Sequence, residues 1–155
     1  MSGPGETSET TSTPHPANRP GLTGDRASTR DSQRPTEAEI RRMVDTFYAR
    51  VREDSVLGPI FEERIGTEWD PHLDRMVDFW STVLLASGRY RGDPIRAHRR
   101  IPGLEPAHFD RWLELFRPVA HGIFPEGLAE DVYGRALRMR MVLERNLGGS
   151  AGARD

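Results

Sequence analysis

His98 is the residue of this sequence whose surroundings best suit chemistry, because it lies in the middle of a very short predicted helix. An Asp-Pro pair begins the segment 93–102 and a second proline ends it, which leaves room for about two helical turns. His98 shares one face of this segment with Ile95 and Ile101. We therefore expect its imidazole to face inward, either as a hydrogen-bonded core residue or as a ligand.

A second inward histidine, His72, is predicted on a helix that begins at Asp70 and Pro71 and runs to about Ser87. On the inward face of this helix, His72 is accompanied by apolar side chains only: Met76, Phe79, Trp80 and Val83. Three aspartates on the opposite face are expected to be solvated rather than to bind a metal. The remaining histidines are predicted in a tail or at the surface, at His15, His108 and His121.

The strongest helix signal in the chain precedes these segments and contains Tyr48. Thr36 and Glu39 form a capping box, and apolar residues then follow at helical spacing as far as Val51. Tyr48 lies at the edge of this apolar stripe, so its ring can be buried while its hydroxyl reaches a polar partner. A packing role and a ligand-facing role both remain open for it.

The other segments predict an all-α domain of about five helices. The Gly-Pro stretch 57–61 is expected to turn the chain after the first long helix. A Glu-Pro pair at Glu105 begins a fourth helix, with Trp112 near the middle of its inward face. Pro125 begins the last helix, and a glycine pair closes it. No stretch alternates with a period of two, so no sheet is expected.

The chain divides into three regions by composition. Residues 1–35 are rich in Ser, Thr, Pro and Gly and contain few apolar side chains, which predicts a disordered tail. Residues 36–148 carry the helical patterns and are expected to form one domain, followed by a short flexible C-terminus at 149–155.

Composition excludes several function classes. The formal net charge of −2 gives no basic surplus for nucleic acid. The absence of cysteine excludes disulfides, thiolate metal sites and covalent haem attachment, so a metal would have to bind histidine or carboxylate. No apolar run is long enough to cross a membrane and the N-terminus has no signal-peptide pattern, so we expect a soluble cytoplasmic protein without membrane partners.

Two inward imidazoles on separate helices lined with aromatic side chains suit haem. In such a site one neutral imidazole binds the iron, and polar groups on the far side meet the ligand of the iron. The alternative is a haem-free helical interaction or sensor module in which both histidines are ordinary core residues.

A series of motifs over residues 38–147 resembles the successive signatures of group III truncated haemoglobins, in order and at the expected spacing. The motifs are Phe47-Tyr48-Ala49-Arg50-Val51-Arg52, Leu57-Gly58-Pro59-Ile60-Phe61, Trp69-Asp70-Pro71-His72, Asp78-Phe79-Trp80, Leu84-Leu85, Gly88-Arg89-Tyr90-Arg91-Gly92-Asp93-Pro94, Ala97-His98 and His108-Phe109-Asp110-Arg111-Trp112-Leu113.

The resemblance implies a truncated globin with two-over-two helix packing around non-covalent b-type haem. His98 matches the proximal iron ligand, and three residues match distal positions: Tyr48, His72 and Trp112. His72 either gates ligand entry or binds the iron directly. Four residues would line the haem pocket: Phe61, Met76, Phe79 and Trp80. Five arginines are available for the haem propionates: Arg89, Arg91, Arg96, Arg99 and Arg100.

The implied function is the binding of O₂, NO or peroxide at the haem iron. Dioxygen bound to haem iron carries partial negative charge, which the phenol of Tyr48 and the indole of Trp112 would stabilise as hydrogen-bond donors. Tight binding favours redox chemistry over oxygen transport. NO dioxygenation and peroxidase-like turnover are both open as enzymatic activities, with a reductase as electron donor.

Overall fold

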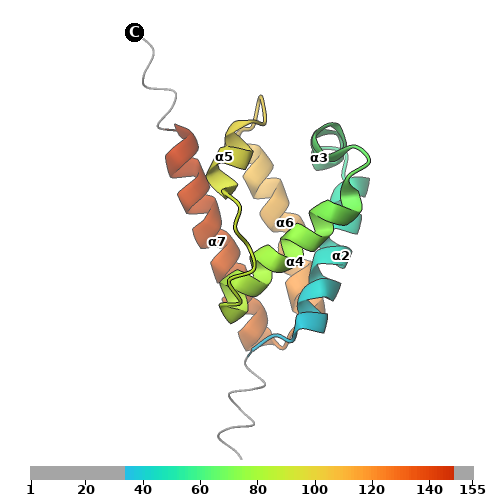
Figure 1. The fold of residues 1–155 in the computed structure, drawn as a ribbon, viewed down its shortest axis with the longest axis vertical. Helices are drawn as coiled ribbons and strands as arrows, with labels where there is room; N and C mark the ends of the chain where they lie inside the picture. Colours follow the sequence, from blue (N-terminus) through green and yellow to red (C-terminus); the bar gives the residue numbers. More distant parts are fainter. Residues whose placement is uncertain (1–33, 149–155) are drawn as a thin grey trace, which may run out of the picture.

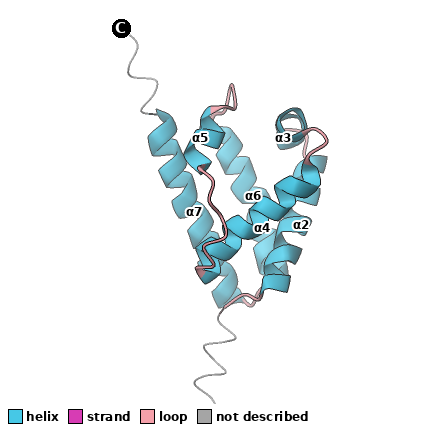
Figure 2. Cartoon of the chain, viewed as in Figure 1, coloured by secondary structure: helices cyan, strands magenta, loops and turns pink. Residues whose placement is uncertain are grey.

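The computed structural model describes residues 34–148, which form six α-helices and, within that range, no strand (Figures 1 and 2). The helices are α2 (Glu37–Glu53), α3 (Leu57–Ile65), α4 (Trp69–Leu85), α5 (Pro94–Arg99), α6 (Pro106–Ile123) and α7 (Glu126–Gly148). The predicted all-α class is confirmed, whereas the predicted number of helices was one too low. The tail predicted to be disordered and the flexible C-terminus lie outside the described residues, except for residues 34 and 35.

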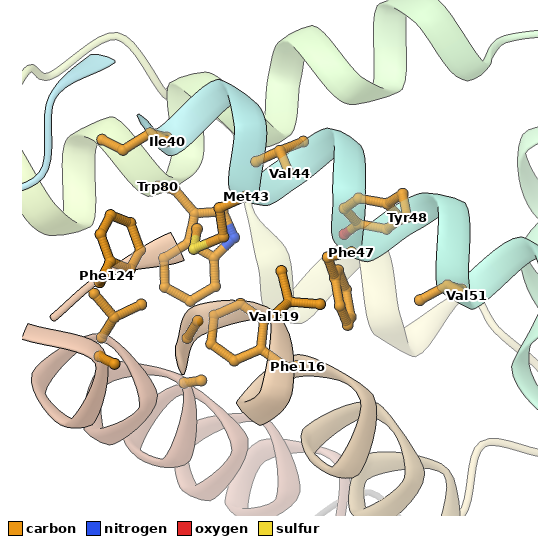
Figure 3. Close-up of a cluster of buried hydrophobic side chains, with 14 of the residues drawn as sticks. Ile40, Met43, Val44, Phe47, Tyr48, Val51, Trp80, Phe116, Val119 and Phe124 are labelled. Carbon is orange, nitrogen blue, oxygen red and sulfur yellow. The ribbon is translucent and has the colours of Figure 1, made fainter. Parts of the chain in front are cut away.

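Helix α2 begins at the predicted capping box and supplies much of the core. The Thr36 hydroxyl accepts a hydrogen bond from the Glu39 backbone N–H at 3.1 Å, and the Glu39 carboxylate accepts one from the Thr36 N–H at 2.9 Å. The apolar stripe of the helix is buried against α3, α4 and α6. Figure 3 shows this stripe above the side chains of α6 and α7, with Trp80 of α4 beside it.

Helix α3 replaces the turn predicted for residues 57–61, so that prediction was wrong. A proline in the first turn of a helix costs no intrahelical hydrogen bond, and Pro59 occupies such a position. The buried Asp54 carboxylate accepts hydrogen bonds from the N–H groups of Val56 and Leu57, at 3.1 and 2.9 Å, just before the helix. A Cβ at Gly58 would lie 2.9 Å from the Arg52 carbonyl oxygen, so glycine permits the close approach of α3 to α2.

Helix α4 begins one residue before the predicted start and ends two residues before the predicted end. Glu68 is the N-cap residue, while Asp70 lies in the first turn and therefore does not cap the helix. Pro71 is tolerated there for the same reason as in α3. At the other end Ala86 adopts a left-handed conformation with φ of 55°, which closes the helix at Leu85.

The short helix α5 begins at the predicted residue but ends at Arg99, before Ile101 and the predicted stop at Pro102. The Asp93 carboxylate accepts a hydrogen bond from the Arg96 N–H at 3.1 Å, and Pro94 occupies the first turn. Helix α5 packs against α7, and α6 packs against both α7 and α2. The long helices α2, α4, α6 and α7 thus enclose one core, while α3 and α5 lie at the same end of the molecule (Figure 1). Between residues 34 and 148, no helix is both long and apolar enough to span a membrane.

Candidate functional site

His98 projects from α5 with one ring nitrogen already engaged. Its Nδ1 lies 2.6 Å from the carbonyl oxygen of Pro94, one turn earlier in the same helix, so Nδ1–H is the donor. Since Nδ1 carries a proton, the lone pair of the uncharged ring lies on Nε2. Metal-binding histidines in proteins share this arrangement, in which the second N–H donates to a carbonyl group. The ring is half-buried and stacks near Phe109, with 6.3 Å between centroids.

The rings of Tyr48 on α2 and His72 on α4 lie against each other. Their ring centroids are 5.1 Å apart and the planes are nearly perpendicular. Phe61 of α3 lies 5.9 Å from Tyr48, and Trp69 lies 6.1 Å from Tyr48 and 5.8 Å from His72. We refer to Tyr48, Phe61, Trp69 and His72 as the aromatic cluster. Three helices therefore converge on the Tyr48 and His72 rings.

Burial sets the protonation of the two polar rings in the aromatic cluster. Tyr48 is 4% exposed, and this burial raises the pKa of its hydroxyl, which therefore keeps its proton at neutral pH. Burial, and to a smaller extent the nearby charge of Arg75, lowers the pKa of His72 to about 4. At neutral pH the Tyr48 hydroxyl is thus a donor, while the His72 ring is uncharged.

Two buried nitrogens of the aromatic cluster have no hydrogen-bond partner among the described residues. They are Nε1 of Trp69 and Nε2 of His72. An unpaired buried polar atom costs about 1–3 kcal/mol, and such atoms in a folded protein require an explanation. A ligand that enters beside His72 would supply the missing partner.

Trp112 of α6 is linked to the aromatic cluster by the ring of Phe47. The Phe47 ring contacts Tyr48 on one side and Trp112 on the other, with centroid distances of 5.0 and 4.8 Å. Trp112 is half-buried and stacks on Phe116. The structure therefore brings Tyr48 and His72 into direct contact and places Trp112 one ring further away.

The predicted pocket-lining residues fall into two groups. Phe61, Met76 and Phe79 are half-buried, so each keeps part of its apolar surface available. Trp80 is only 3% exposed and stacks on Phe116 at 5.2 Å within the core (Figure 3). Contact of these four residues with a cofactor stays a prediction.

The side chains available as ligands and hydrogen-bond partners, His98 and His72 among them, suit haem. Nowhere between residues 34 and 148 do three His, Cys, Asp or Glu side chains converge on a point that could hold a bare metal ion. A metal at His98 would therefore need other ligands from a cofactor, and the porphyrin ring of haem supplies four. The half-buried apolar side chains of α3 and α4 and the unpaired nitrogen of His72 fit an apolar cofactor with a polar ligand.

A basic hollow of about 470 Å³ lies at the end of the molecule shared by α3 and α5. It is lined by Arg64, Arg91, Asp93, Arg96, Ala97 and Arg100. In the described part of the chain, none of its four arginines pairs with a carboxylate. Arg89, by contrast, binds Glu37 and Asp78 at 2.7 and 3.1 Å, and Arg99 donates to a backbone carbonyl of α7. Three of the five arginines predicted for an anionic group thus line the basic hollow.

The sequence interpretation assigned no role to two residues that the structure places in the aromatic cluster and in the basic hollow, Trp69 and Arg64. Trp69 precedes His72 by three residues, so the helical period places both on one side of α4. That spacing was the available signal for Trp69. Arg64 lies in the last turn of α3, beyond the turn predicted at 57–61, and no local pattern pointed to it.

Comparisons with known proteins agree with this architecture. The family model described as bacterial-like globin matches residues 35–142. A group 3 truncated hemoglobin of Campylobacter jejuni is 34% identical over 103 residues, which cover 64% of this chain and 81% of that protein. The crystal structure of a group III truncated hemoglobin from Campylobacter jejuni matches with a TM-score of 0.70 and 31% identity, over 73% of this chain and 91% of that one.

Proposed function

Since the chain belongs to the bacterial-like globin family, as a group III truncated haemoglobin, we propose that His98 is its proximal haem ligand and that the bound ligand serves redox chemistry. Family membership makes the protein a haem-binding globin that takes small diatomic ligands such as O₂. We also propose that the cofactor is b-type haem. Residues 36–148 form the globin domain in this proposal.

The hydrogen bond between His98 Nδ1–H and the Pro94 carbonyl is the observation that carries the proposal. It holds the ring in the tautomer that a metal requires, and it does so within a helix only six residues long. No other described histidine has this arrangement. His108 uses Nδ1 to accept a hydrogen bond from the Glu105 N–H, and His121 pairs with Glu130.

On the distal side, Tyr48 and Trp112 act as hydrogen-bond donors to the ligand. When bound, haem supplies an iron that binds diatomic gases and exchanges electrons. The Tyr48 hydroxyl keeps its proton at neutral pH, and the indole of Trp112 can only donate. The uncharged His72 ring lies against Tyr48, where it either gates ligand entry or binds the iron directly.

Two donors favour retention of the ligand over its release. A hydrogen bond to a charged group contributes about 1.5–3 kcal/mol, so each donor would slow ligand escape by about 10- to 150-fold. Slow release suits NO dioxygenation or peroxidase-like turnover better than oxygen transport. Such turnover needs an electron donor, and we propose a reductase for this role.

The basic hollow supplies partners for the two haem propionates. Arg64, Arg91, Arg96 and Arg100 reach it from α3, from the segment before α5 and from α5 itself. Guanidinium groups bind carboxylates through paired N–H donors, and none of these four is occupied by a carboxylate of the described chain. Arg64 thereby joins the three arginines predicted from the sequence.

The ligand assignment is tested by comparing His98→Ala with His121→Ala. We expect the purified full chain to show the Soret band of bound haem, His98→Ala to lose or weaken it, and His121→Ala to keep it. His121 is exposed and far from α5 in sequence, which makes it a suitable control. Loss of the band only in His121→Ala would refute the assignment. A folded protein that stays colourless with added haem would instead favour a haem-free interaction module.

A further inference from the structure

Five aromatic rings form a continuous chain from the ligand side of the site to the protein surface. Trp112 stacks on Phe116 with centroids 5.0 Å apart and planes 12° apart, and Phe116 stacks on Trp80 at 5.2 Å and 11°. Trp80 meets Phe79 edge-on at 5.4 Å, and Phe79 meets Tyr90 edge-on at 5.2 Å. The chain thus crosses from α6 through α4 to the segment before α5.

The order of ring types along this chain is informative. Tryptophan and tyrosine lose an electron far more readily than phenylalanine does. Trp112, Trp80 and Tyr90 are therefore the oxidisable members, and a single phenylalanine ring separates each from the next. Rings in van der Waals contact couple electronically better than saturated side chains across the same distance. Stepwise electron transfer requires oxidisable groups at short intervals, and the order of these rings provides them.

The middle of the chain is more deeply buried than its two ends, Trp112 and Tyr90. Trp80 is 3% exposed and Phe116 is fully buried (Figure 3), so the middle of the chain is shielded from solvent. Tyr90 is half-buried and so keeps part of its ring accessible from outside. An electron can therefore enter from solution at Tyr90, while Trp80 in the middle of the path is shielded from reaction with solutes.

Tyr90 is held in place by its own segment. Its backbone N–H donates to the Thr82 hydroxyl at 3.1 Å. A Cβ at residue 92 would lie only 2.5 Å from the Tyr90 hydroxyl oxygen, so the glycine at that position leaves room for the ring to fold back onto Phe79. The contact with Phe79 therefore depends on Gly92.

We propose that Trp112, Trp80 and Tyr90 form an electron-transfer path from the protein surface to the ligand site, with Tyr90 as the place where a phenolic reductant such as hydroquinone is oxidised. This inference rests on the proposed haem function. Reduction of one hydrogen peroxide to two water molecules consumes two electrons and two protons. Each electron leaves Tyr90 along the path while its phenolic proton passes to water. The resulting phenoxyl radical regains one electron and one proton from the hydroquinone.

The other two tyrosines provide contrasts within the same protein. Tyr48 lies in the aromatic cluster, where it contacts His72 and is buried. Tyr133 of α7 has the guanidinium of Arg117 over its ring, 4.9 Å from the centroid, and it meets no aromatic ring among the described residues. A cation over a ring opposes loss of an electron from it. Tyr133→Phe is therefore the matched control for Tyr90→Phe.

The test treats the haem-loaded full chain with hydrogen peroxide in the presence of a nitroso spin trap and locates the adduct by peptide mass spectrometry. We expect the adduct on Tyr90 in the natural protein and in Tyr133→Phe. Trp80→Phe keeps an aromatic ring at this position but removes the middle oxidisable one, and Gly92→Ala displaces Tyr90 without altering its chemistry. Both should lower the Tyr90 adduct at least tenfold, and Tyr90→Phe should lower hydroquinone oxidation by a similar factor.

The outcomes separate this path from the proposed function. A natural protein without a Soret band would overturn the proposed function, and the path with it. A normal Soret band with peroxide consumption, but with the adduct on Tyr48 or Tyr133, would overturn the path alone. An unchanged Tyr90 adduct in both Trp80→Phe and Gly92→Ala would do the same.

Discussion

Removing a single oxygen atom from Tyr48 tests the hydrogen bond that we propose between its hydroxyl and the ligand. The ring of Tyr48 is 4% exposed and contacts Phe47, Phe61 and His72 with centroid distances of 5.0, 5.9 and 5.1 Å. Tyr48→Phe keeps these contacts and creates no cavity. We expect its free energy of unfolding to change by less than about 1 kcal/mol, so any large functional effect belongs to the hydroxyl.

The expected effect follows from the charge of the ligand. A hydrogen bond from a neutral donor to a charged acceptor contributes about 1.5–3 kcal/mol, which corresponds to about 10- to 150-fold in a rate. We therefore expect dioxygen to dissociate from Tyr48→Phe about 10 to 150 times faster than from the natural protein. Trp112→Phe removes the second donor and should also speed release.

Stopped-flow measurement of dioxygen dissociation gives the required rates, and carbon monoxide provides a control ligand. Carbon monoxide accumulates little negative charge, so its release should change much less than that of dioxygen in both variants. Tyr133→Phe, whose ring lies on α7 beneath Arg117, should leave both rates unchanged. Dioxygen release that is unchanged in both Tyr48→Phe and Trp112→Phe would show that neither residue donates to the ligand.

Three further predictions concern the fold and the haem site. Asp54→Asn should lower the free energy of unfolding by about 1.5–3 kcal/mol at neutral pH, because the carboxylate binds the Arg111 guanidinium and caps α3. Hydrogen bonds from Arg111 and from the N–H groups of Leu57 and Val56 hold the pKa of Asp54 below its ordinary value of 3.8. Urea titrations should therefore show this difference in unfolding free energy shrinking as the pH falls below that value. Gly58→Ala should lower the free energy of unfolding, measured by heat or urea, by about 1–3 kcal/mol, since its Cβ would press on the backbone of α2. An unchanged free energy of unfolding would mean that α3 can shift away from α2 without cost. The double variant Arg64→Glu and Arg100→Glu should transfer haem to apomyoglobin at least about tenfold faster, and equal rates would exclude the basic hollow as the propionate site.

Local signals in the sequence were sufficient for α2 and α5. The capping box at Thr36 and the helical period that follows it depend on residues within a few positions of one another. The same holds for the short helix of His98, which Asp93 caps and Pro94 begins. Even the hydrogen bond that orients the His98 ring is local, because its acceptor lies four residues earlier.

The misassigned segment 57–61 shows where local reasoning fails. Gly58 and Pro59 resemble a helix-breaking pair, yet both lie in the first turn of α3. Proline is harmless there, and glycine is required because the backbone of α2 approaches closely. That approach is a contact between two helices, so no pattern within one helix reveals it.

The sequence by itself determined the helical class and, through its resemblance to a family, the expected cofactor. These properties follow from periodicity, capping and motif spacing, all of which are one-dimensional. The tertiary structure decided which rings meet: Tyr48 with His72, Trp69 beside both, and the chain from Trp112 to Tyr90. It also decided that Arg64 joins the arginines near α5. Contacts of this kind depend on how helices distant in sequence cross, and only the packed fold specifies that crossing.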